Sequence, residues 1–132
     1  MNDQPAAGSG VSKTAVAGWV AALPPVGMLA MSGAMKLAGG EQVEQGFADL
    51  GWPSSLAPAL GIVELVCVAL YLLPKTAVLG AILITGYLGG ATSAHARLEE
   101  VELAVPVLLG VLAWVSLWLR DPRVRALAPL RS

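Results

Sequence analysis

Charged side chains are scarce in this sequence of 132 residues. Asp, Glu, Lys and Arg make up 13% of it, whereas about 25% is usual for a soluble domain. Hydrophobic residues make up 56%. The 8 basic and 9 acidic residues nearly balance, so the chain lacks the basic patch that nucleic-acid binding requires. These figures exclude a soluble globule and a nucleic-acid-binding protein, and they make the lipid bilayer the expected surroundings.

Cysteine and histidine occur once each, as Cys67 and His95. A single cysteine excludes an internal disulfide, a CxxC redox pair and a Cys-rich metal site. A single histidine excludes a haem held by two histidines of the same subunit. One histidine and one buried carboxylate do not complete a metal coordination sphere. We therefore expect neither haem nor a bound metal.

Long apolar runs, in contrast, occur four times, and each has the length of a helix that crosses a bilayer. They predict an all-α, four-helix transmembrane bundle over residues 13–120, with spans at about 14–37, 56–73, 76–96 and 103–119. Residues 1–12 are small and polar and predict a disordered tail. Residues 121–132 predict a basic cytoplasmic tail.

The first span contains Pro24 and Pro25, which predict a kink or a break near its middle. A cleaved signal peptide is disfavoured for this segment because it lacks a strongly basic start and is longer than a usual signal core. In the linker 38–55, Val43, Phe47 and Leu50 follow helical spacing. They predict a short amphipathic helix on the membrane surface, with a solvated loop as the alternative.

The basic residues predict the orientation. With four spans, six basic residues share one side of the membrane and two share the other. The first group comprises Lys13, Lys75, Arg120, Arg123, Arg125 and Arg131, and the second comprises Lys36 and Arg97. By the positive-inside rule, both termini are expected in the cytoplasm of a multi-pass protein.

Glu64 is the only ionisable carboxylate within the second apolar run. An acid at mid-depth in a bilayer is costly unless it is protonated, paired or facing a polar cavity, so such residues are functional-site hypotheses. Lys36 ends the first span and His95 ends the third, roughly 14 Å nearer the outer surface by helical rise. Helical side chains lean toward their own N-terminus, so Lys36 and His95 lean inward and Glu64 leans toward them. The sequence thus predicts an outward-facing cavity with Glu64 at its floor.

Tyr87 shares a helical face with His95 and is expected to line the same cavity. Simpler interpretations stay open for each residue. Lys36 is also explained as an anchor that reaches the interface, and His95 as a solvated helix end. Glu64 is also explained by a structural pair with Lys36, or with the hydroxyl of Thr85 or Tyr87.

The loop after the third span carries three glutamates, Glu99, Glu100 and Glu102. They are most simply a solvated loop. Glu102 begins the fourth span, and it is the member of this group that we consider as a partner of His95.

Three segments carry a resemblance to a known family. They are SGAMKLAG at 32–39, GIVELV at 61–66 and ATSAHARL at 91–98. With this spacing, the chain resembles the DoxX-like family of small bacterial membrane proteins over residues 14–119. The resemblance implies a four-helix transmembrane bundle in the bacterial inner membrane. Lys36, Glu64 and His95 match the recurring polar positions of that family.

Some members of that family are membrane subunits of thiosulfate:quinone oxidoreductase, and others associate with redox or oxidative-stress proteins. The resemblance therefore implies a membrane subunit or accessory of a redox system, with a quinone as one candidate ligand. The sequence shows no separate soluble domain and no redox-active residue pair. Quinone or small-molecule binding is thus expected in preference to direct electron transfer.

Three functional hypotheses follow. The leading one is a protein that binds a small lipophilic or anionic molecule in the polar cavity through Lys36, Glu64, Tyr87 and His95. The second is a membrane-embedded isomerase, cyclase or hydrolase with Glu64 as general acid or base and with Lys36 and His95 in its active site. The third is a structural subunit of a larger membrane complex. A protein partner or a homo-oligomer is compatible with each, and transport is disfavoured because four short spans leave little room for a pathway.

The predicted orientation can be tested by cysteine labelling. In a Cys67→Ala background, a cysteine placed at Gly46 should react with an impermeant maleimide added to intact cells. A cysteine placed at Lys75 should react only after the membrane is opened. The reverse pattern would contradict the positive-inside assignment.

Overall fold

The structure, a computed structural model, describes residues 12–129. The described chain is helical and contains no strand. Six α-helices and two short 3₁₀ turns follow one another: α1 (Lys13–Ala38), α2 (Glu41–Asp49), η1 (Ser54–Leu56), α3 (Ala57–Leu72), α4 (Ala77–Arg97), η2 (Val101–Leu103), α5 (Ala104–Arg120) and α6 (Pro122–Leu127). The predicted disordered tail falls on residues that lie outside the described range, apart from Ser12, whose hydroxyl caps α1 by accepting from the Ala15 N–H at 3.1 Å.

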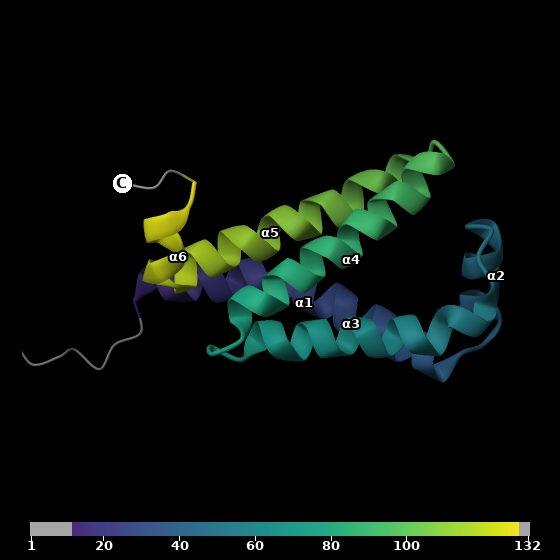
Figure 1. The fold of residues 1–132 in the computed structure, drawn as a ribbon, viewed down its shortest axis with the longest axis horizontal. Helices are drawn as coiled ribbons and strands as arrows, with labels where there is room; N and C mark the ends of the chain where they lie inside the picture. Colours follow the sequence, from purple (N-terminus) through teal and green to yellow (C-terminus); the bar gives the residue numbers. More distant parts are fainter. Residues whose placement is uncertain (1–11, 130–132) are drawn as a thin grey trace, which may run out of the picture.

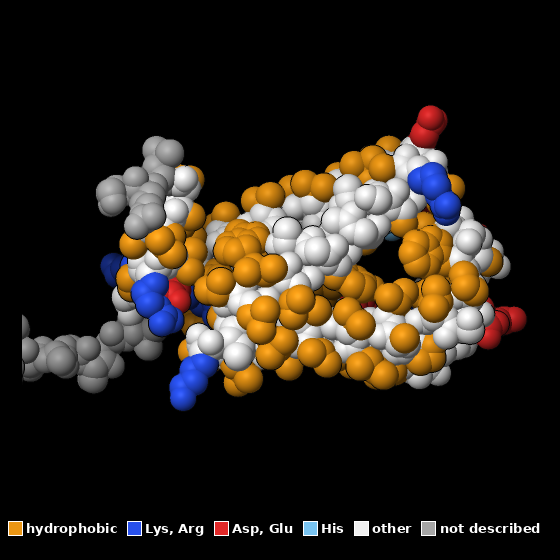
Figure 2. Space-filling model, in the orientation of Figure 1, with side chains coloured by type: hydrophobic (Ala, Val, Ile, Leu, Met, Phe, Trp, Pro, Cys, Tyr) orange, Lys and Arg blue, Asp and Glu red, His pale blue; other side chains and the backbone are white. Residues whose placement is uncertain are grey.

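The all-α prediction and the four spans are confirmed. α1, α4 and the continuous segments 54–72 and 101–120 are each long and apolar enough to cross a membrane. Their bounds differ from the predicted spans by two residues at most. The amphipathic helix predicted between the first two spans is α2. Figure 2 shows a hydrophobic surface over the middle of the bundle, with charged side chains gathered at its two ends.

The four long helices form a ring in which each packs against two neighbours. α1 lies between α3 and α5, and α4 closes the ring on the other side. Figure 1 shows α3 and α4 leaving a tight turn side by side and then diverging toward the end of the bundle that carries α2. The bundle is therefore closed at the end with α6 and wider at the end with α2.

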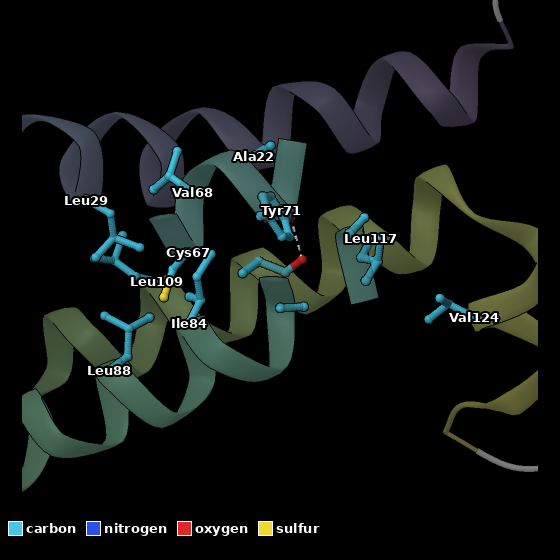
Figure 3. Packing of buried hydrophobic residues seen from close by; sticks show 13 residues of the cluster. Ala22, Leu29, Cys67, Val68, Tyr71, Ile84, Leu88, Leu109, Leu117 and Val124 are labelled. Atoms are coloured by element: carbon cyan, nitrogen blue, oxygen red, sulfur yellow. Dashed lines mark hydrogen bonds between the residues drawn. The ribbon is translucent and has the colours of Figure 1, made fainter. Parts of the chain in front are cut away.

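The closed end is fixed by the contact between Tyr71 and Gly80. Tyr71 is completely buried, and its hydroxyl donates to the carbonyl of Ala113 at 2.7 Å, which joins α3 to α5 (Figure 3). The backbone of α4 passes so close that a Cβ on Gly80 would lie 2.5 Å from the Cα of Tyr71. The apolar core lies around Tyr71, as Figure 3 shows, with Cys67, Ile84 and Leu117 among its members.

An arginine adds to the closure at the same end. The guanidinium of Arg120 lies 4.1 Å from the ring centre of Trp19 and 4.9 Å from that of Tyr71. It also donates to the hydroxyl of Ser116 at 3.2 Å. These contacts join the end of α5 to α1 and α3, since cations are attracted to the faces of aromatic rings.

Two local features differ from simple expectation. Pro24 and Pro25 do not end α1, which runs unbroken from Lys13 to Ala38, so the predicted break is absent. The segment predicted as a basic tail begins with α6, which Asp121 caps by accepting from the Arg123 N–H at 2.9 Å. The neighbouring Arg123 guanidinium lowers the pKa of the Asp121 carboxyl.

The Tyr71–Gly80 contact predicts a sensitive position. Gly80→Ala should lower the free energy of unfolding by about 2–3 kcal/mol, because the added methyl group overlaps the backbone of α3. Gly89→Ala on the same helix is the control, since a Cβ there meets nothing within 4 Å. Equilibrium unfolding in detergent micelles measures both, and equal stabilities of the two variants would contradict the close packing.

Candidate functional site

Two facing glycines bring α1 and α3 together at the wider half of the bundle. A Cβ on Gly33 would lie 3.0 Å from the carbonyl oxygen of Gly61, and a Cβ on Gly61 would lie 2.7 Å from that of Gly33. Consecutive spans run in opposite directions, so the residues that follow these two glycines lie on opposite sides of the crossing. Their side chains can meet because each leans back toward the N-terminus of its own helix. Lys36 follows Gly33 by three residues, and Glu64 follows Gly61 by three.

Lys36 and Glu64 form a buried ion pair at this crossing. The ammonium nitrogen of Lys36 lies 3.1 Å from Oε1 and 3.0 Å from Oε2 of Glu64. The Ser32 hydroxyl donates to Oε1 at 3.1 Å and accepts from Lys36 at 2.5 Å. The side chain of Glu64 is only 3% exposed and that of Lys36 is 18% exposed. The three groups thus satisfy one another.

A cavity of about 600 Å³ lies beside this pair, between the diverging helices. Figure 2 shows the molecule hollowed at this place, between α4 and α3 near α2. Phe47, Leu50 and Trp52 line it from α2 and the loop that follows. Most of the remaining lining is apolar, and its polar members are Ser32, Lys36, Glu64, Tyr87, His95 and Glu102.

Small residues of α4 leave room for the cavity. Gly86, Gly90 and Ala94 repeat at every fourth position and line it. A Cβ on Gly86 or Gly90 would meet nothing within 4 Å. The cavity therefore exists partly because these three positions of α4 carry almost no side chain.

His95 lines the cavity, but its hydrogen-bond partner is not Glu64. Its Nδ1 lies 2.6 Å from a carboxylate oxygen of Glu100. The expectation that Glu102 partners His95 is wrong, because the turn after α4 brings Glu100 back over the ring. Glu100 is thus not merely part of a solvated loop, while Glu102 lines the cavity.

The structure brings together all four residues that the sequence singled out, since Lys36, Glu64, Tyr87 and His95 line one cavity. Thr85, considered as a partner of Glu64, lies elsewhere: its hydroxyl donates to the Ala81 carbonyl at 2.7 Å and accepts from Trp114 at 2.6 Å.

Sequence reasoning missed Ser32 and Glu100. Ser32 precedes Lys36 by four residues and so shares its helical face, a signal that the sequence did contain. The contact of Glu100 depends on how the turn after α4 closes, and no spacing rule indicates it.

The chemistry of the cavity is acid–base and hydrogen bonding. Within residues 12–129, no cluster of three or more His, Cys, Asp or Glu side chains could hold a metal ion. Polar groups gather in an otherwise apolar lining, as is usual for pockets that bind small molecules.

Comparison with known protein families gives a match. A family model described as the DoxX-like family matches residues 15–116. No curated protein and no solved structure matches the chain.

Because Lys36 and Glu64 form an ion pair, substituting both should destabilise the protein less than substituting Lys36 alone. Lys36→Met should lower the free energy of unfolding by about 3 kcal/mol, because Glu64 then stays buried without its partner. Lys36→Met combined with Glu64→Leu should recover most of this loss, since both charges are gone. Lys75→Met, at an exposed lysine of the turn between α3 and α4, is the control. Unfolding in mixed micelles measures all three, and a double variant that is no more stable than Lys36→Met alone would contradict a direct pair.

Proposed function

The chain belongs to the DoxX-like family of membrane proteins, and from that premise we propose that it binds a small lipophilic molecule in the cavity beside Lys36 and Glu64. The observation that carries the proposal is the cavity itself. Its volume of about 600 Å³ lies within the range of small-molecule sites. Its walls are apolar, and its polar groups come from α1, α3, α4 and the segment that leads into α5.

The contacts that Lys36 already makes favour an uncharged ligand over an anionic one. Its ammonium group already contacts both carboxylate oxygens of Glu64 and the hydroxyl of Ser32. An anion entering the cavity would have to compete with Glu64 for this charge. It would also meet the carboxylate of Glu102, which is part of the cavity lining. An uncharged molecule avoids both costs.

The role that fits such a ligand is that of a membrane subunit or accessory of a redox system. A quinone is lipophilic, dissolves in the bilayer and carries carbonyl oxygens that accept hydrogen bonds. The phenol of Tyr87 is a suitable donor on the cavity wall. We place the protein in the bacterial inner membrane with both termini in the cytoplasm, so that the cavity lies toward the outer side.

An acid–base enzyme is less well supported. Glu64 would act as general acid or base, yet both of its oxygens are engaged by Lys36 and one also by Ser32. A general base must be within reach of the proton that it removes. The described geometry would require this ion pair to open first.

A matched pair of glycine substitutions tests ligand binding. Gly90→Leu projects a side chain into the cavity, whereas Gly89→Leu projects one into the groove outside, between α4 and α5. A Cβ at either position meets nothing within 4 Å, so both variants should fold. The purified proteins are titrated with a short-chain naphthoquinone, and binding is followed by quenching of tryptophan fluorescence.

We expect Gly90→Leu to weaken naphthoquinone binding about tenfold or more, because the leucine occupies the space of the ligand. Gly89→Leu should bind like the wild type. Equal affinities in all three proteins would contradict the proposal. Native mass spectrometry of the wild type then shows whether a quinone or another lipophilic molecule is retained from the cell.

A further inference from the structure

The two ring nitrogens of His95 face different surroundings. Nδ1 lies 2.6 Å from Glu100 Oε2. His95 lines the cavity, whereas Glu100 is not part of its lining. The Nδ1 edge of the ring is therefore turned away from the cavity toward Glu100. Because Glu100 occupies Nδ1, Nε2 is the ring nitrogen that is left for a ligand in the cavity.

The turn after α4 places Glu100 for this contact. The Glu100 N–H donates to the carbonyl of His95 at 3.3 Å, and the Glu99 N–H donates to that of Ala96 at 3.1 Å. These two bonds form a Schellman motif, in which the residue at the Glu99 position is usually glycine. Glu99 takes the left-handed conformation there, with φ of 56°. Glu100 thus contacts His95 twice, once at the backbone carbonyl and once at the ring.

The contact determines which nitrogen carries hydrogen. An ionised carboxylate only accepts hydrogen bonds, so Nδ1 must be the donor. In the neutral ring, Nε2 is then an acceptor. The cavity therefore presents an imidazole acceptor, which is suited to a hydroxyl group of a ligand.

We propose that Glu100 is a positioning residue that holds His95 with its hydrogen on Nδ1, so that Nε2 accepts a hydrogen bond from the hydroxyl of an uncharged lipophilic ligand. This inference rests on the proposed function and adds the ligand class: a phenol, a quinol or another hydroxyl-bearing amphiphile. The other charged groups of the cavity agree with it, because Lys36 and Glu64 neutralise each other and Glu102 repels anions.

Nitrogen NMR tests the hydrogen position directly. Because the chain has 1 histidine, ¹⁵N-histidine labelling of an untagged protein gives signals from His95 alone. In the wild type at neutral pH, we expect Nδ1 to be protonated and Nε2 to be bare. Glu100→Ala should remove this preference, and Glu100→Gln should retain part of it because the amide oxygen still accepts. Glu99→Ala removes the same charge from the neighbouring residue and should change nothing.

Binding of three matched probes tests the ligand class. Naphthol carries a hydroxyl, its methyl ether lacks the hydrogen, and naphthoate is an anion of similar size. Naphthol should bind about five- to tenfold more tightly than the ether, as expected for one hydrogen bond in an apolar site. Naphthoate should bind most weakly. His95→Ala should abolish the difference between naphthol and ether. Glu100→Ala should reduce it, because the ring then populates both tautomers, whereas Glu99→Ala should keep it.

The outcomes separate this inference from the proposed function. A wild-type His95 protonated on Nε2 would overturn the positioning role of Glu100. Equal binding of naphthol and its ether, with both still weakened by Gly90→Leu, would overturn the hydroxyl preference but leave the cavity as the binding site. Naphthol that binds Gly90→Leu as tightly as the wild type would overturn the cavity proposal itself.

Discussion

The burial of Glu64 is the constraint on which the wider half of this bundle depends. A carboxylate in an apolar interior costs several kcal/mol unless a partner compensates it. The partner comes from α1, and it can reach because Gly33 and Gly61 let the two backbones approach. A larger residue at either glycine would push the helices apart and move Lys36 away from the carboxylate. The ion pair therefore depends on the close packing of the two glycines.

The two ends of the bundle differ in packing: one is filled by side chains and the other holds a cavity. At the closed end, Tyr71 and Arg120 fill the space between the helices and Gly80 lets them pack closely, with a hydrogen bond and a cation–π contact in place of a cavity. At the wider end, α3 and α4 diverge and the small face of α4 leaves the space empty. The closed end provides the stability that allows the other end to hold an open volume, since cavities lose packing contacts.

The sequence predicted the helices better than the details of the site. Hydropathy identifies a span of about 20 residues with little ambiguity, and side-chain direction was enough to predict that Lys36 and Glu64 meet. The predicted partner of His95 was wrong. Whether Glu100 or Glu102 contacts the ring depends on the left-handed backbone conformation of Glu99, which no helical periodicity reveals. The cavity volume could not be predicted from the sequence either, since it depends on the angle between α3 and α4.

The self-contained ion pair also has a consequence for specificity. A free lysine at the floor would attract any anion, and a free glutamate any cation. Lys36, Glu64 and Ser32 together present a dipolar, uncharged surface, so the floor discriminates little among neutral molecules. Selectivity must then arise higher in the cavity, where Tyr87 offers a hydroxyl and His95 a ring nitrogen on the wall formed by α4. Because these groups project from one rigid helix, their spacing is fixed before a ligand enters, and a ligand that matches it loses little free energy to reorganisation of the protein.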